Sequence, residues 1–255
     1  MRAALAGARM QLWRARRSPD DLQILFTTPF FAIVLLGMTL AAGRDDLLGH
    51  ALLAPVLMGL WMFSIALAGD VLLEEKGGGT LELAISSPTS LLWVVLGRIG
   101  SVTMLGLLPM VETYLVARLL FRVEVEVPHP GVFTVAALAT TFAMAGTSTL
   151  ISAWFVLARG GGMFANFLSY PVYILSGVMV PVAFLPDWIE PLSRLVFLTW
   201  GAELLRDSLE PGPVSDVGLR LAVVVGLGLV GLAAGQGLVR LALRRVRELG
   251  TVSSA

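Results

Sequence analysis

An acidic and glycine-rich segment, Glu74-Glu75-Lys76-Gly77-Gly78-Gly79-Thr80-Leu81-Glu82, separates two long apolar stretches of the chain. Its charged side chains favour water, and its glycines allow backbone conformations that other residues resist. Thr80 can cap a second short helix that begins near Leu81. The spacing therefore predicts a short helix–turn–helix. Two interpretations remain open: an element that docks into a pocket of another protein, and an ordinary solvated loop.

A carboxylate inside an apolar stretch is the second candidate. Ionisable groups within membrane-spanning segments are costly and raise a functional hypothesis by default. Glu112 stands beside Pro109 in such a stretch. Three roles fit it: contact with a cationic or amphiphilic substrate, pairing with Arg118 or another helix, and simple exposure near the outer head groups.

Metal and thiol chemistry are not expected. The chain has no cysteine and only two histidines, His50 and His129, which both fall in predicted loops. Disulfides, thiolate metal sites, a histidine metal cluster and a proton relay are therefore excluded or improbable on sequence grounds. The formal net charge is zero, so bulk attraction to nucleic acid is not suggested either.

The composition places the chain in a membrane. Of its 255 residues, 56% are hydrophobic and only 14% are charged. Apolar stretches of about 18 residues or more with few charges indicate membrane helices. We therefore expect an all-α polytopic membrane protein, one domain over residues 1–255, with six spans at 22–42, 51–73, 92–121, 132–157, 163–184 and 217–243.

Three further segments complete this expected architecture. Arginines and apolar residues alternate in 1–19, which predicts an amphipathic helix on the membrane surface or a simple basic tail, and not a cleavable signal peptide. Residues 74–90 join spans two and three. Residues 185–216 contain prolines and charges that break a span, so short extracellular or re-entrant helices are expected there, with Trp188 and Trp200 at head-group depth.

Six spans put both termini on the same side of the membrane. In this topology twelve of the 18 Lys and Arg residues lie on the side of the termini. The positive-inside rule then favours cytoplasmic termini and a cytoplasmic segment 74–90. The loop at 124–130 and the segment 185–216 would face outward.

Small residues predict how the last spans pack. Threonines and serines recur along the fourth span, where they can bond to their own helix or to a neighbour, with a translocation surface as the second interpretation. Gly231-Leu232-Ala233-Ala234-Gly235 is a small-xxx-small pattern typical of close helix packing. Methionines such as Met144 favour ordinary packing or an adaptable apolar surface.

Two motifs carry a resemblance to a known family. An acidic pair followed by Gly-Thr-Leu-Glu, directly after the second of six spans, resembles the cytosolic signature of ABC-2 type permeases. The stretch from Tyr170 to Pro181, followed by Phe184-Leu185-Pro186-Asp187-Trp188-Ile189, is similar to that family's late region. The stretch from Asn166 to Asp207 also resembles drug-resistance permeases such as the daunorubicin exporter's membrane subunit. The third glycine of Gly77–Gly79 departs from the pattern and would loosen the turn.

The resemblance implies a coupling helix that docks on an ATPase subunit. The residues carried over to this role are Asp70, Glu74, Glu75, Lys76, Gly77, Gly79, Thr80, Leu81 and Glu82. It also implies a dimer, with a second copy or a paralogous permease, and two cytosolic ATPase subunits in a cell membrane, as in the bacterial plasma membrane. The candidate substrate pathway is Glu112, Thr141, Met144, Tyr170 and Tyr173.

ATP hydrolysis is expected on a separate chain. A phosphate-binding loop needs Gly-x-x-x-x-Gly-Lys-Ser/Thr. The single lysine, Lys76, is followed by glycine. ATP and Mg are therefore expected on the partner, with no cofactor on this chain.

The preferred function is the membrane subunit of an exporter of a hydrophobic or amphiphilic compound, such as a drug or a lipid-like metabolite. A permease-like assembly factor that handles haem is the first alternative, since both histidines fall on the expected outer face. A membrane-embedded enzyme is the second, although nothing in the sequence resembles a protease dyad or a metal site.

Overall fold

The structure is a computed structural model that describes residue 9 and residues 23–77, 97, 99–101, 103–157 and 161–249. Within these residues the regular elements are all helical. The main helices are α2 (Gln23–Ala41), α3 (Leu48–Gly77), α6 (Leu108–Leu115), α7 (Pro130–Leu157), α8 (Gly161–Leu175), α10 (Phe197–Asp207) and α11 (Val217–Leu249).

Four stretches in the described part of the chain are long and apolar enough to cross a membrane. They are Asp45–Ile65, Ile99–Leu120, Pro130–Trp154 and Val217–Leu238. A shorter apolar helix, Phe26–Ala41, precedes them. The expectation of an all-helical, multi-pass membrane protein is confirmed. The shorter helix overlaps the predicted span one, and the four long stretches overlap the predicted spans two, three, four and six.

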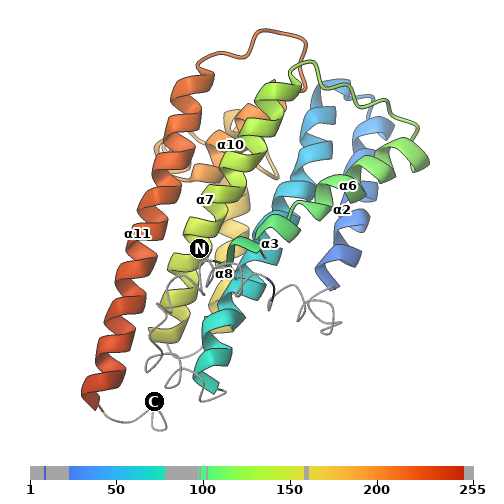
Figure 1. Cartoon of the computed structure of the whole chain (residues 1–255). Helices are drawn as coiled ribbons and strands as arrows, with labels where there is room; N and C mark the ends of the chain where they lie inside the picture. Colours follow the sequence, from blue (N-terminus) through green and yellow to red (C-terminus); the bar gives the residue numbers. More distant parts are fainter. Residues whose placement is uncertain are drawn as a thin grey trace.

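The helices form one bundle (Figure 1). α11 and α7 run side by side, α3 packs on the other side of α7, and α2 packs against α3. α6 contacts both α2 and α3, and α10 packs against α7, α11 and α3. The connections 42–47, 121–129 and 208–216 lie together at one end of the bundle, which we call the loop end.

α7 and α11 approach each other through glycine. A Cβ placed on Gly228 would lie 2.6 Å from Ala143 Cα, and one on Gly146 would lie 2.2 Å from the carbonyl oxygen of Gly228. A Cβ on Gly235 would lie 2.7 Å from the backbone nitrogen of Leu150. Only hydrogen fits at these places, so the close packing predicted from the Gly231–Gly235 pattern is confirmed.

The threonines of α7 bond mainly to their own helix. The hydroxyls of Thr134, Thr141 and Thr147 donate to the carbonyl oxygens four residues earlier, at 2.8, 2.7 and 3.0 Å. Such bonds satisfy a hydroxyl without a polar partner from another helix. The packing interpretation of this span is therefore the one that the geometry supports.

α3 continues past the predicted end of the second span. It is helical through Gly77, so Glu74, Glu75 and Lys76 extend it rather than begin a separate element. It also begins earlier than expected, at Leu48, and contains Pro55. His50 consequently lies in the first turns of α3, and its assignment to a loop was wrong; His129 does lie in a connection.

The third span is interrupted rather than uniform. A turn at Gly106 and Leu107 precedes α6, and Pro109 stands in its first turn, where a missing N–H costs nothing. The helix then widens to a π-helix over Val116–Leu120 and ends before Phe121.

The helix of the fifth span ends before the predicted boundary at residue 184. α8 stops at Leu175, and Gly177 takes a φ of +69°. The backbone N–H groups of Val178 and Met179 then both donate to the carbonyl oxygen of Tyr173. This is a glycine-based helix terminus, which the apolar run beyond Gly177 conceals in the sequence.

Part of the segment 185–216 packs back into the bundle, while its predicted placement at the outer membrane face stays a prediction. After the short α9 (Glu190–Ser193), most of α10 is buried between α3, α7 and α11. Trp188 is 72% exposed, whereas Trp200 is half-buried and its indole N–H donates to the carbonyl oxygen of Arg194.

Several predicted segments lie outside the described residues. They are 1–19 apart from Arg9, the part of the coupling segment over 78–90, and the first part of the third span over 92–96.

Candidate substrate pathway

A cavity of about 250 Å³ with mostly apolar walls opens between α2, α3 and α8. The name apolar cavity is used below for this cavity alone. Its walls carry ten residues: Thr27, Thr28, Phe31, Pro55, Met58, Gly59, Met62, Ser169, Tyr170 and Tyr173. Phe31 and Tyr170 are 49% and 67% exposed, so the cavity has an open side on the surface of the chain. Such a lining suits an apolar body with few polar contacts.

The wall between α3 and α8 is held by two side-chain hydrogen bonds. Trp61 Nε1 donates to Ser169 Oγ at 3.0 Å, and Tyr173 Oη donates to the carbonyl oxygen of Met58 at 3.2 Å. The rings of Trp61 and Tyr173 meet edge to face, with centroids 6.5 Å apart. Tyr173 is 3% exposed and so forms a fixed wall, while Tyr170 marks the opening.

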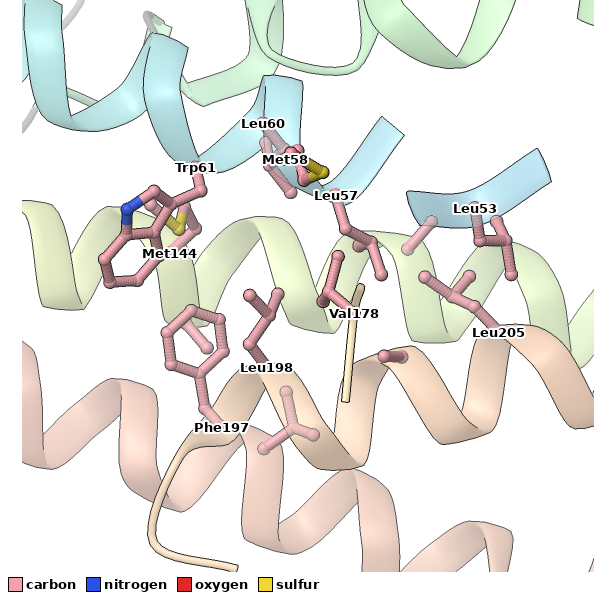
Figure 2. Close-up of a cluster of buried hydrophobic side chains, with 14 of the residues drawn as sticks. Leu53, Leu57, Met58, Leu60, Trp61, Met144, Val178, Phe197, Leu198 and Leu205 are labelled. Atoms are coloured by element: carbon pink, nitrogen blue, oxygen red, sulfur yellow. The ribbon is translucent and has the colours of Figure 1, made fainter. Parts of the chain in front are cut away.

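Thr141 and Met144 do not reach this cavity. Met144 is fully buried in the core cluster that also contains Trp61 and Phe197 (Figure 2). Thr141 is 1% exposed and its hydroxyl donates to Ala137. Both side chains therefore pack in the bundle interior. Met144 shares the core cluster with Tyr173, but neither Thr141 nor Met144 lines the apolar cavity.

Glu112 is also separate from the apolar cavity. It is half-buried on α6, and its Oε2 is buried with no hydrogen-bond partner among the described residues. Arg118 instead pairs with Glu124 at 2.9 Å, so the Glu112–Arg118 pair does not form. Glu112 lies outside the lining of all three cavities described in this section.

A second cavity of about 280 Å³, also with mostly apolar walls, lies nearer the loop end. It is lined from α3 by Leu52, Leu53 and Val56, from α6 by Met110, Val111, Thr113 and Tyr114, and elsewhere by Val125, Val127, Phe133 and Leu209.

A larger and more polar cavity of about 540 Å³ occupies the loop end, and we call it the polar cavity. Charged or titratable residues of its lining are Asp45, Asp46, His50, Glu124, Glu126, Arg206 and Glu210. Arg206 is the buried member of this set, 7% exposed on α10, and its Nη2 donates to the carbonyl oxygen of Gly177 at 2.6 Å. Burial lowers the pKa of Arg206 to about 10, which leaves the guanidinium charged at neutral pH.

The sequence did not predict the hydrogen bond between Trp61 and Ser169 beside the apolar cavity, and it did not predict that Arg206 is buried. Trp61 and Ser169 are 108 positions apart, so no local pattern joins them. Gly59 carried a signal in principle, because a small residue inside a span often marks close packing. A Cβ at Gly59 would lie 2.8 Å from Pro109 Cγ.

The predicted coupling residues are only partly described. Asp70, Glu74, Glu75, Lys76 and Gly77 are backbone-helical at the end of α3. Gly79, Thr80, Leu81 and Glu82 lie outside the described residues. Their role in docking stays a prediction.

The absence of a metal or haem cofactor stays a prediction. In the part of the chain that the structure describes, no group of three or more His, Cys, Asp and Glu side chains gathers in an arrangement that could hold a metal ion. His129 Nε2 is engaged by the carbonyl oxygen of Gly212 at 2.8 Å.

Comparison with known families agrees with this architecture. The family model described as ABC-2 type transporter matches residues 4–209. No curated protein matches the chain.

Proposed function

The chain belongs to the ABC-2 type transporter family, and from that premise we propose that it exports a hydrophobic or amphiphilic compound. It is the membrane permease subunit of such a transporter. In our proposal a separate cytosolic ATPase docks on the segment 70–82 and drives transport. The termini are cytoplasmic and the loop end faces outward.

The continuity of α3 carries this proposal. One helix runs from Gly77, inside the predicted coupling segment, to Leu48 at the loop end. Its 30 residues correspond to about 45 Å at 1.5 Å per residue. Residues of α3 also line all three cavities. A displacement of the cytosolic end can therefore act on each of these three cavities through one continuous helix.

The lining of the apolar cavity indicates the class of cargo. Its walls are mostly aliphatic and aromatic, with threonine, serine and tyrosine hydroxyls as the polar groups. Because Phe31 and Tyr170 leave one side open, a membrane-dissolved molecule can enter laterally. A sugar would leave many hydroxyls without partners in such a site, which is unfavourable.

We further propose that two permeases form the transporter, either two identical chains or this chain with a paralogue. The family resemblance supports this assembly.

Export assays with a co-expressed ATPase test the proposal. In proteoliposomes, Glu75→Lys and Gly79→Pro are expected to abolish stimulation of ATP hydrolysis by cargo and to stop export. Both changes alter the docking segment and leave the cavities intact. Glu190→Lys, an exposed charge reversal in α9, is the matched control and is expected to leave both rates unchanged. Normal coupling in both segment variants, or cargo movement without any ATPase, would contradict the mechanism.

A further inference from the structure

We propose that the polar cavity at the loop end binds the headgroup of a zwitterionic amphiphile, with its anionic part on Arg206 and its cationic part at the acidic rim. This inference rests on the proposed function, because it names the chemistry of the cargo that leaves through this end. Its evidence is separate from the apolar cavity and from the coupling segment.

The deep side of the polar cavity provides a cation without a carboxylate partner of its own. Arg206 is 7% exposed and lines the cavity. Its Nε is buried and has no hydrogen-bond partner among the described residues, while its Nη2 bonds only a neutral carbonyl. Buried arginines are normally paired with an anion.

The nearest acidic side chains are already engaged. Glu203 and Asp207 interact electrostatically with Arg206. Glu203, however, pairs with Arg194 at 2.8 Å, and Asp207 pairs with Arg220. Arg206 therefore retains hydrogen-bonding capacity for a phosphate or carboxylate, which a guanidinium binds through charge-assisted bonds.

His50 is a second polar group in the lining of the polar cavity. His50 lines the cavity from α3, and its Nε2 is buried with no hydrogen-bond partner among the described residues. An imidazole nitrogen is a donor or an acceptor according to its tautomer. A ligand with an oxygen or a hydroxyl at this depth would satisfy both His50 and Arg206.

The open side of the cavity has the opposite charge. Five carboxylates line it, of which Asp46 pairs with Arg44 at 2.8 Å and Glu124 with Arg118 at 2.9 Å. The other three form no ion pair in the described part of the chain and are exposed: Asp45, Glu126 and Glu210. A simple anion would meet repulsion at this rim, and a simple cation would meet repulsion at Arg206. A ligand that carries both charges satisfies both ends.

Binding of small headgroup probes tests this assignment without any ATPase. Calorimetric titrations use the purified protein in maltoside micelles, with phosphocholine, methyl phosphate and tetramethylammonium as zwitterionic, anionic and cationic probes. Phosphocholine is expected to bind at least about tenfold more tightly than either single-charge probe, a difference of about 1.4 kcal/mol. Similar affinities for all three probes would overturn the proposal.

Variants at Arg206 and at the acidic rim are expected to lose binding of different probes. Arg206→Gln is expected to weaken phosphocholine and methyl phosphate by about tenfold or more and to spare tetramethylammonium, as loss of a charge-assisted bond predicts. Arg206→Lys retains the charge and controls for folding. Glu126→Gln with Glu210→Gln is expected to weaken phosphocholine and tetramethylammonium but not methyl phosphate. Asp187→Asn, an exposed carboxylate outside the cavity, is the matched control and should change nothing.

Two further outcomes separate this inference from its premises. Dodecylphosphocholine is expected to bind more tightly than phosphocholine. Equal affinities would assign the site to a soluble zwitterion and would overturn the proposal that the ligand is an amphiphile. Unchanged phosphocholine binding in the rim variant would overturn the site itself, even if Arg206→Gln did not fold. Headgroup selectivity in a chain that shows no ATP-driven export would contradict the proposed function alone, whereas export without selectivity would contradict this inference alone.

Discussion

Replacement of Gly228 by alanine tests the close contact between α7 and α11. The added methyl carbon would lie 2.6 Å from the Cα and 3.0 Å from the Cβ of Ala143. Carbon atoms in contact are normally about 3.5–4.0 Å apart. Since the nearest atom belongs to backbone, no rotamer change relieves the clash, and the helices must separate locally by about 1 Å.

The cost follows from that separation. A gap of this size forfeits a substantial part of the dispersion attraction along the seam, and overpacking of a tight core typically costs about 1–3 kcal/mol. Alanine also favours a helix over glycine by about 1 kcal/mol, which partly masks the effect. Gly226→Ala, two positions away on the same helix with nothing within 4 Å of its Cβ, receives the same helical gain without a clash.

The difference between the two variants therefore isolates packing. Reversible unfolding in mixed micelles is expected to show Gly228→Ala about 1–3 kcal/mol less stable than Gly226→Ala. Thermal melting monitored by gel filtration should give a lower midpoint for Gly228→Ala than for Gly226→Ala. The expected difference is about 2–4 °C per kcal/mol for a chain of this size. Equal stability of the two variants would refute the inference that backbone contact at Gly228 sets the spacing of α7 and α11.

Three further substitutions are expected to act through single local contacts. Tyr173→Phe removes a buried hydroxyl hydrogen bond to α3 and should lower the stability by about 1 kcal/mol in the same unfolding assay. Gly177→Ala forces a side chain into a φ of +69° and should cost about 1–2 kcal/mol, while Gly212→Ala, with nothing within 4 Å, should be neutral in thermal melting. Asp207→Asn neutralises the partner of Arg220 and should lower the melting midpoint, whereas an unchanged midpoint would mean that this ion pair contributes nothing.

The fourth and sixth spans could be predicted well because local and global signals agree there. Pro130 stands at the start of α7, and the uncharged stretch that follows continues to Leu157. α11 begins at the predicted Val217 and extends past the predicted end into its arginine-rich tail. Apolar length is a property of the sequence itself, so such helices need no tertiary information.

The fifth span shows where apolar length misleads. Residues after Leu175 are as apolar as those before it, and hydropathy alone cannot tell a helix from a folded-back segment. The glycine at 177 and the prolines at 171 and 181 were visible signals. Proline is tolerated within α8 at Pro171, so its presence alone does not locate the end of the helix.

The structure groups two of the five residues of the candidate pathway around one cavity, and their contact with a substrate stays a prediction. Tyr170 and Tyr173 came from the late motif and do share the apolar cavity. Thr141 and Met144 came from composition along one helix, and that helix turns them toward the core. Which face of an all-apolar helix meets a cavity depends on neighbouring helices, and periodicity does not encode it when every face is apolar.

The early end of α8 and the buried guanidinium of Arg206 on α10 are linked by a hydrogen bond. Because α8 ends at Leu175, the carbonyl of Gly177 is not part of a helical hydrogen-bond ladder, and it accepts the Arg206 hydrogen bond at 2.6 Å. A continuous helix would have used the same carbonyl internally. These two residues are 29 positions apart, and neither signals the other in the sequence. A leucine at this position of α10 would avoid the desolvation of a charge, which costs several kcal/mol in a protein interior. The structure keeps the charge, and among the described residues only one nitrogen of this guanidinium has a hydrogen-bond partner, so packing alone does not account for an arginine at this place.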